Sequence, residues 1–183
     1  GRLALSGHNL NEDPPMTQRA TQLIDTLGLQ PHPEGGWYRE VFRSAVQVNP
    51  ADERAARSAL TSIYFLLEAG QHSRWHRVLS DEVWVHLEGV PLALWTCDAA
   101  LRTAPAHVRL GPVDVHGTRP QHVVPAGQWQ AARPIESHSA GDFTLVACMV
   151  GPGFDFADFS LMAPDGDEAA AVRHHWPALA ALI

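Results

Sequence analysis

The stretch His76-Arg77-Val78-Leu79-Ser80-Asp81-Glu82 decides how the fold of this sequence is interpreted. It joins two predicted strands, residues 72–78 and 82–87, with a histidine near the end of the first and a glutamate at the start of the second. We expect this stretch to lie at the centre of a polar pocket.

The second of these strands alternates between two kinds of side chain. Glu82, Trp84 and His86 fall on one face, because successive side chains of a strand point to opposite sides. Gly89 follows as a turn residue. The alternation predicts that Trp84 and His86 line the pocket wall together with Glu82.

Outward from this stretch, the chain consists of short apolar runs separated by turns. Fourteen glycines and 14 prolines supply the turns. The further predicted strands are residues 37–43, 60–67, 92–96, 106–110, 122–124, 129–132 and 143–150. Many short strands without regular alternation with helices predict an all-β sandwich or barrel.

Helices are expected only near the two ends. Apolar residues recur at helical spacing over residues 17–27, and Gly28 supplies a stop. Residues 167–182 predict a short C-terminal helix interrupted near Pro177. Residues 1–15 are polar and proline-rich and are expected to form a mobile tail, with residues 16–183 as a single domain.

The composition argues against several classes of partner. The net charge is −7 and no run of basic residues occurs, so no nucleic-acid partner is expected. No apolar stretch of about 18 residues is present, so no membrane-spanning helix is expected. Cys97 and Cys148 are few and far apart, which predicts reduced, buried cysteines and a cytoplasmic protein.

A second group of residues, Val124-Pro125-Ala126-Gly127-Gln128-Trp129-Gln130, surrounds a predicted turn. Together with five other strings it resembles the cupin-5 family, a cupin family of undefined function. The resemblance covers roughly residues 17–162. The other strings are His32-Pro33-Glu34-Gly35-Gly36-Trp37-Tyr38-Arg39-Glu40, Ile63-Tyr64-Phe65-Leu66-Leu67, Trp75-His76-Arg77, Ser80-Asp81-Glu82-Val83-Trp84 and Gly151-Pro152-Gly153-Phe154-Asp155-Phe156 with Asp158-Phe159.

The resemblance implies a double-stranded β-helix, the cupin jelly roll, in a homodimer whose pocket is similar to that of nucleotide-sugar epimerases. Cupin motifs usually supply four metal ligands, and His76 and Glu82 match two of them. Val78 and Gln130 stand at the other two positions. Valine cannot bind a metal, and an amide oxygen binds one more weakly than imidazole does. The resemblance therefore implies a depleted metal site.

The leading functional hypothesis is a small-molecule-binding cupin of isomerase or epimerase type, acting on a carbohydrate-like or carboxylate-bearing metabolite. His76 would be the base, and Glu82 its partner. A tyrosine would return the proton. Tyr38 and Tyr64 are the only tyrosines in the chain, and Tyr64 is taken as the catalytic one.

Two alternatives remain open. In the first, His76, Glu82 and Gln130 bind Mn, Fe or Zn in a metal-dependent oxygenase or lyase. In the second, the barrel is a non-catalytic ligand sensor. Fold alone does not choose among these.

Further residues are expected to bind the substrate. Arg77 and Arg39 suit a carboxylate or phosphate, and Trp129 suits a flat or sugar-like ring. Gln130 would orient the substrate if no metal is bound. The three phenylalanines of residues 154–159 are expected in the core or in a dimer interface.

Overall fold

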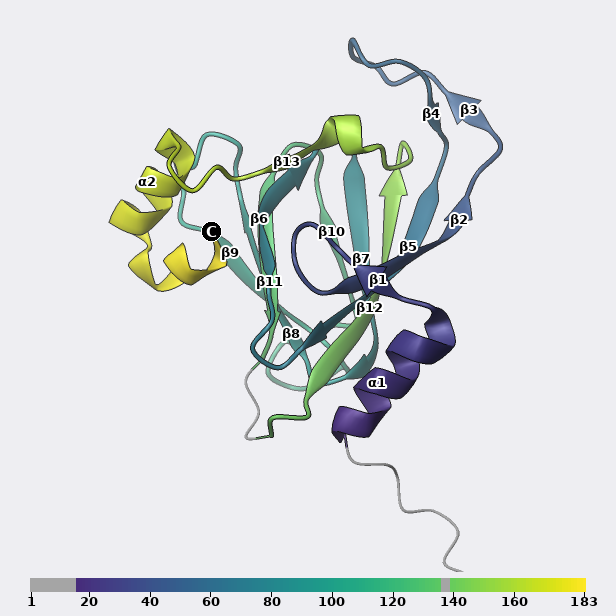
Figure 1. Ribbon diagram of the computed structural model, residues 1–183. Coiled ribbons are helices and arrows are strands. Elements are labelled where there is room, and N and C mark those ends of the chain that lie inside the picture. Colours follow the sequence, from purple (N-terminus) through teal and green to yellow (C-terminus); the bar gives the residue numbers. More distant parts are fainter. Residues whose placement is uncertain (1–15, 136–138) are drawn as a thin grey trace, which may run out of the picture.

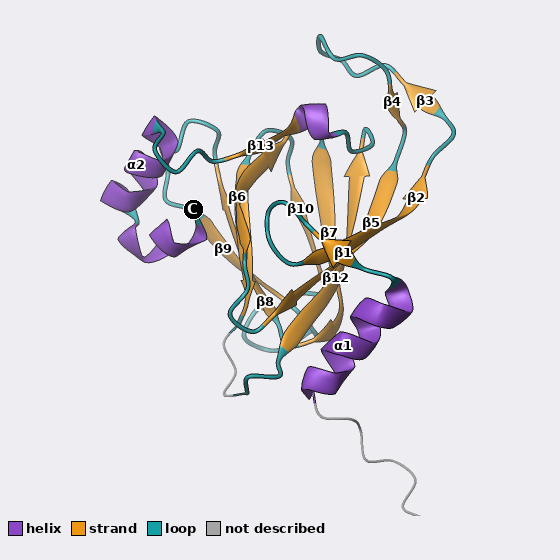
Figure 2. Cartoon of the chain, viewed as in Figure 1, coloured by secondary structure: helices purple, strands orange, loops and turns teal. Residues whose placement is uncertain are grey.

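The computed structural model describes residues 16–135 and 139–183. Two antiparallel sheets face each other and enclose the core (Figures 1 and 2). The predicted tail, residues 1–15, lies outside the described residues. The six-stranded sheet has the order β1 (Gln30–Pro31), β2 (Trp37–Arg43), β5 (Thr61–Glu68), β12 (Phe143–Gly151), β7 (Asp81–Gly89), β10 (Gln121–Val124).

The five-stranded sheet has the order β13 (Phe159–Leu161), β6 (Ser73–Val78), β11 (Trp129–Pro134), β8 (Leu92–Cys97), β9 (Ala106–Leu110). A separate two-stranded hairpin, β3 (Gln47–Val48) with β4 (Arg57–Ser58), projects beyond the sheets (Figure 1). The all-β jelly roll expected from the sequence is therefore confirmed.

The space between the sheets is filled by alternate side chains of both. Phe65, Trp84, Leu94 and Val146 are almost completely buried there and belong to one cluster. Alternation along each strand sends the remaining side chains outward. The outward side chains are again apolar wherever a helix covers the sheet.

The two helical regions lie on opposite sides of the sheets (Figure 2). Helix α1 (Met16–Leu27) packs Ala20 and Leu23 against Leu66 and Phe143 of the six-stranded sheet. It ends at Gly28, whose positive φ of 62° suits a residue without a Cβ. The N-terminal helix expected from the sequence is thus present.

The C-terminal region covers the outer face of the other sheet. It consists of helix α2 (Asp167–His175) and the 3-10 segment η2 (Pro177–Leu182), which begins at the proline expected to interrupt the helix. Val172 and Leu182 pack there against Trp75 and Trp129. Among the described residues, no helix has the length and apolar character needed to cross a membrane.

The structure adds four short strands to those expected. Strands β1, β3, β4 and β13 have two or three residues each, which is too short to show a period in sequence. Residues 49–56 connect β3 to β4.

Candidate functional site

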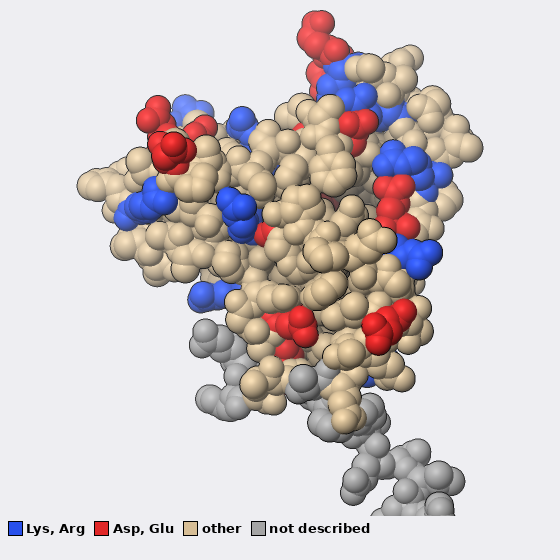
Figure 3. Space-filling model, in the orientation of Figure 1, with Lys and Arg blue, Asp and Glu red and all other residues tan. Residues whose placement is uncertain are grey.

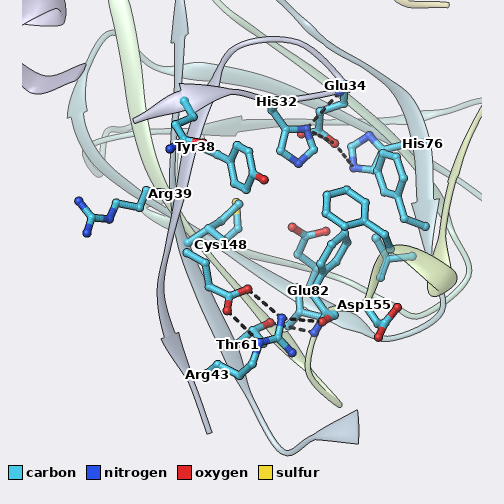
Figure 4. Close-up of a pocket in the computed structure, with 18 of the residues that line it drawn as sticks. His32, Glu34, Tyr38, Arg39, Arg43, Thr61, His76, Glu82, Cys148 and Asp155 are labelled. Carbon is cyan, nitrogen blue, oxygen red and sulfur yellow. Dashed lines mark hydrogen bonds and ion pairs between the residues drawn. The ribbon is translucent and has the colours of Figure 1, made fainter. Parts of the chain in front are cut away.

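A cavity of about 760 Å³ lies between the two sheets (Figure 4). Its size falls in the range of small-molecule sites. Strands β2, β5, β6, β7 and β12 contribute to its wall, together with the turn before β2 and the segment that follows β12. Its polar lining includes His32, Glu34, Tyr38, Thr61, His76, Glu82, Cys148 and Asp155, together with Gln30, Arg39, Glu40 and Arg43.

His76 projects from β6 into the cavity, and both of its ring nitrogens have partners. Nδ1 lies 2.7 Å from the carbonyl oxygen of Arg74, and Nε2 lies 3.1 Å from Oε2 of Glu34 (Figure 4). The ring is 2% exposed, and burial lowers its pKa. A carbonyl oxygen can only accept, so Nδ1 carries a proton and Nε2 is the nitrogen that can exchange one.

Glu34 reaches His76 from a turn far away in sequence. The backbone N–H of Arg74 donates to the Glu34 carbonyl at 2.9 Å, which holds the turn against β6. Gly35 has a φ of 112°, and a Cβ there would lie 2.2 Å from the carbonyl oxygen of His72. Only glycine permits this close approach. Burial raises the pKa of Glu34 to about 8, opposed by a hydrogen bond with Ser73.

His32 lies beside this pair and contacts Tyr38 edge to face, with ring centroids 4.5 Å apart. Its Nδ1 accepts the backbone N–H of Glu34 at 3.1 Å. Burial is the main cause that lowers the pKa of His32 to about 4, and electrostatic repulsion by His76 adds to the shift. The ring is therefore neutral, with its proton on Nε2.

Glu82 is fixed from behind by an amide. The Trp84 indole N–H donates to Oε1 of Gln130 at 2.9 Å, and Nε2 of Gln130 donates to Oε2 of Glu82 at 2.6 Å. An indole N–H can only donate, which sets the orientation of the amide. Burial raises the pKa of Glu82 to about 7, although His76 and the Gln130 hydrogen bond oppose the shift. Glu82 therefore titrates near neutral pH.

An aromatic wall faces these polar groups. Phe154, Phe156 and Phe159 come from one segment, and their ring centroids lie 5.0–6.1 Å apart. Phe159 is also 5.5 Å from the His76 ring. All three line the cavity and none is fully buried, so they do not belong to the core, whereas a dimer interface stays a prediction.

The aromatic wall is tied to the β3–β4 hairpin by a buried carboxylate. Asp158 receives hydrogen bonds from Arg57 at 2.8 and 2.9 Å and from Arg54 at 3.2 Å. These guanidinium groups lower the pKa of Asp158. Phe154 is held as well, because its backbone N–H donates to Oγ1 of Thr61 at 2.9 Å.

Of the residues expected at the site, His76, Glu82 and Arg39 line the cavity. Arg39 points away from its centre (Figure 4) and donates to the Leu27 carbonyl at 3.1 Å. Gln130 is buried directly behind Glu82. The structure therefore brings together the pair that the sequence put first, although Glu34 and not Glu82 is in contact with Nε2 of His76.

Tyr64 does not line the cavity, and its expected catalytic placement is wrong. It pairs with Arg39 across β5 and β2 and packs in the cluster beneath α1. Directly paired residues of antiparallel strands share a face. The neighbouring pair, Tyr38 with Phe65, therefore points inward. Tyr38 is the tyrosine of the cavity, and Figure 4 shows its hydroxyl directed into the open space.

Four other expected binding residues also lie outside the cavity. Trp129 belongs to the cluster beneath α2, and Arg77 lies over its ring at 4.8 Å, because both point outward from their strands. Trp84 fills the core. His86 shares the face of Glu82, but it is four residues along β7, about 13 Å away, and its Nε2 lies 3.1 Å from the Gly89 carbonyl oxygen.

The sequence interpretation missed the contribution of the turn before β2. His32 and Glu34 entered the sequence interpretation only as part of a string that resembles the family, without a role at the site. Their signal was a carboxylate and an imidazole next to Gly35-Gly36. A glycine pair permits close backbone approach, and polar side chains beside such an approach are candidates for a site.

The donor set expected for a metal does not fit one in this arrangement. The Gln130 oxygen is used by Trp84, and Nε2 of His76 is used by Glu34. Throughout residues 16–135 and 139–183, no group of three or more His, Cys, Asp or Glu side chains is arranged to hold a metal ion. We derive no chemical step through a metal.

Two solved structures match most of the chain. One is a protein of Shewanella oneidensis, 33% identical over 89% of this chain and 93% of that chain, with a TM-score of 0.73. The other is a hypothetical protein of Leishmania major, 35% identical over 90% and 96% of the two chains, with a TM-score of 0.75. The capsular polysaccharide assembling protein of Staphylococcus aureus shares only the fold, at 8% identity, a TM-score of 0.52, and coverage of 73% and 31%.

Among curated proteins, a 59-residue segment is 39% identical to part of the isoleucine–tRNA ligase of Halorhodospira halophila (strain DSM 244 / SL1). The match spans 30% of this chain and 6% of that relative, so it assigns no activity. The family model Cupin_5, described as cupin superfamily (DUF985), matches residues 21–162. This range contains both sheets and every group that lines the cavity. The resemblance noted in the sequence is confirmed, and the chain belongs to the Cupin_5 family.

Proposed function

We propose that this cupin binds a small metabolite in the cavity and moves a proton on it, as an isomerase or epimerase does, without a metal. The observation that carries the proposal is the contact between Nε2 of His76 and Oε2 of Glu34 at 3.1 Å, in a cavity that Glu82 also faces. Such a site holds two units that can exchange a proton with a ligand, the His76–Glu34 pair and Glu82. A homodimeric assembly and a cytoplasmic location stay predictions of the sequence.

The pKa values favour proton transfer at neutral pH. General acid–base catalysis works best when the pKa of the catalytic group lies near the working pH. Burial brings the pKa of Glu82 to about 7 and that of Glu34 to about 8. The His76–Glu34 pair already holds a proton between Nε2 and Oε2, so this pair can serve as the acid that donates one.

The reaction we propose takes a proton from a carbon next to a carbonyl group. Ionised Glu82 receives this proton, and the electron pair moves onto the carbonyl oxygen. The Nε2–H of His32 is a donor that can stabilise that oxygen. A proton returned by a different group, Tyr38 or the remaining acid, gives the isomer. Atoms and charge balance without an oxidant or a reductant.

Deuterium incorporation tests this proposal without knowledge of the substrate. The protein is incubated in D2O with a mixture of aldoses, ketoses and 2-oxo acids, and mass spectrometry detects carbon-bound deuterium. Wild-type protein is expected to label at least one compound. His76→Gln and Glu82→Gln are expected to lower the labelling rate roughly 100-fold or more.

Two controls make the result decisive. His86→Ala lies on the same strand as Glu82 but outside the cavity, and is expected to label at the wild-type rate. Tyr38→Phe removes one hydroxyl while keeping the ring contacts. Equal labelling by wild-type protein and His76→Gln would contradict the proposal. Ligand binding with no labelling would instead support the sensor alternative.

A further inference from the structure

The charge of the cavity restricts what can enter it. His76 Nδ1 carries a proton because it lies 2.7 Å from a backbone carbonyl oxygen. The contact from Nε2 to Glu34 then requires one more proton, either on the carboxyl or on the ring. In both arrangements the His76–Glu34 pair has a net charge of zero. It offers no cation to an anionic ligand.

The second histidine is neutral for an independent reason. Nδ1 of His32 accepts the backbone N–H of Glu34, so its proton sits on Nε2. The low pKa of this ring agrees with that assignment. Nε2 has no hydrogen-bond partner among the described side chains and backbone groups. It is available as an uncharged donor for a ligand oxygen.

The cations near the cavity already have partners. The chain contains no lysine, and of the described arginines only Arg39 and Arg43 line the cavity. Arg39 donates to the Leu27 carbonyl and points outward (Figure 4). Arg43 holds both carboxylate oxygens of Glu40 at 2.8 Å. On the face shown in Figure 3, basic and acidic side chains are interspersed, and uncharged residues occupy most of the centre.

The remaining wall combines acidic and aromatic groups. Glu82 and Asp155 line the cavity, and three phenylalanines provide an apolar surface. A carboxylate or phosphate placed there would meet carboxylate oxygens without a free cation. A ring with hydroxyl groups on its rim and C–H groups on its faces would satisfy both kinds of wall.

We propose that the cavity selects an uncharged hydroxylated ring over a carboxylate or phosphate of the same size. This inference rests on the proposed function only in taking the same cavity as the site. It narrows the expected ligands to the carbohydrate-like class and removes the carboxylate-bearing class.

Three sugars with one ring and different charges test the selection. D-glucose, D-glucuronate and D-glucose 6-phosphate are titrated at pH 7.5, and binding is followed by ligand-detected NMR. Glucose is expected to bind about tenfold more tightly than glucuronate or the phosphate, equivalent to about 1.4 kcal/mol. In Glu82→Gln, which removes a negative charge, that preference is expected to fall below about threefold.

The matched control is Glu88→Gln, on the same strand but outside the cavity, which is expected to keep the wild-type preference. Tighter binding of glucuronate or the phosphate than of glucose would overturn the inference. So would a failure of D-glucose, D-galactose and D-xylose all to bind. Because binding is measured without turnover, loss of deuterium labelling would contradict the proposed function and leave this selectivity result unaffected.

Discussion

Two buried acidic regions of this protein differ in the groups that their carboxyl oxygens contact. At the rim, Asp158 is 3% exposed and contacts the guanidinium groups of Arg54 and Arg57. In the cavity, Glu34 and Glu82 are 6% and 7% exposed and contact a histidine and an amide. The pKa of Asp158 is lowered, and those of Glu34 and Glu82 are raised.

Burial alone therefore does not decide the charge of these carboxyl groups. A permanent cation keeps Asp158 ionised, so it serves as a fixed structural anchor for the aromatic wall. Without such a cation, Glu34 and Glu82 exchange protons near neutral pH. This difference separates the groups that hold the site in place from the groups that can perform chemistry.

The largest expected effect comes from removing the anchor. Asp158→Ala leaves the largely buried Arg57 guanidinium without its counter-charge and leaves Arg54 with Asp52 alone. Removing one partner of a buried ion pair costs about 3 kcal/mol or more of unfolding free energy. Urea denaturation measures this loss. A loss similar to that of an exposed carboxylate variant would show that the rim cluster is not an anchor.

The next effect concerns the pH dependence of stability. The pKa of Glu82 is about 7 in the folded protein and 4.5 as its reference value. The folded state therefore holds its proton more tightly, and the stabilisation is full below pH 4.5 and is lost as pH rises through 7. The unfolding free energy of wild-type protein should therefore decrease between pH 5 and pH 8. In Glu82→Gln this decrease should be smaller than in wild-type protein by about 2 kcal/mol.

Denaturation curves at several pH values check this slope. His32 contributes in the opposite sense, because its pKa is lowered to about 4, and its stabilisation is lost as pH falls through that value. The two windows overlap between pH 4.5 and 6.5, so the difference between wild-type protein and Glu82→Gln isolates the Glu82 contribution. An identical slope from pH 5 to pH 8 in wild-type protein and Glu82→Gln would contradict the raised pKa.

A smaller effect is expected at Gln130, which connects the core to the cavity. Gln130→Leu removes the donor to Glu82 and leaves the Trp84 N–H without its acceptor. We expect a loss of about 1–2 kcal/mol of unfolding free energy and a higher pKa for Glu82. Gln130→Glu retains an acceptor for Trp84 and serves as the comparison. An unchanged pKa of Glu82 in Gln130→Leu would show that the amide has no influence on it.

The smallest effect is expected at an exposed ion pair. Arg19 and Glu88 are 2.6 Å apart, and their side chains are 37% and 38% exposed. Exposed pairs contribute about 0.2–1 kcal/mol. Glu88→Gln should therefore change thermal stability only slightly, and the change should shrink in high salt. A loss as large as that of Asp158→Ala would mean that burial does not distinguish the two regions.

The sequence predicted the strands well because short turns bound β6 and β7, and because side chains of two kinds alternate clearly along β7. It also identified His76 and Glu82 as neighbours of one pocket. The choice between the tyrosines failed because β5 is a continuous apolar run covered on both faces, so periodicity gave no orientation. Glu34 was missed as the partner of His76 because their contact joins residues that are 42 positions apart.

The most direct test of the central claim is a carbon-detected NMR titration of the side-chain carboxyl groups. Glu82→Gln and Glu34→Gln assign the two signals. We predict that Glu82 titrates near pH 7 and Glu34 near pH 8, while the pKa of Asp158 lies below its ordinary value. Titration of Glu34 and Glu82 at the ordinary value of 4.5 would contradict the account, because the cavity would then hold two permanent anions.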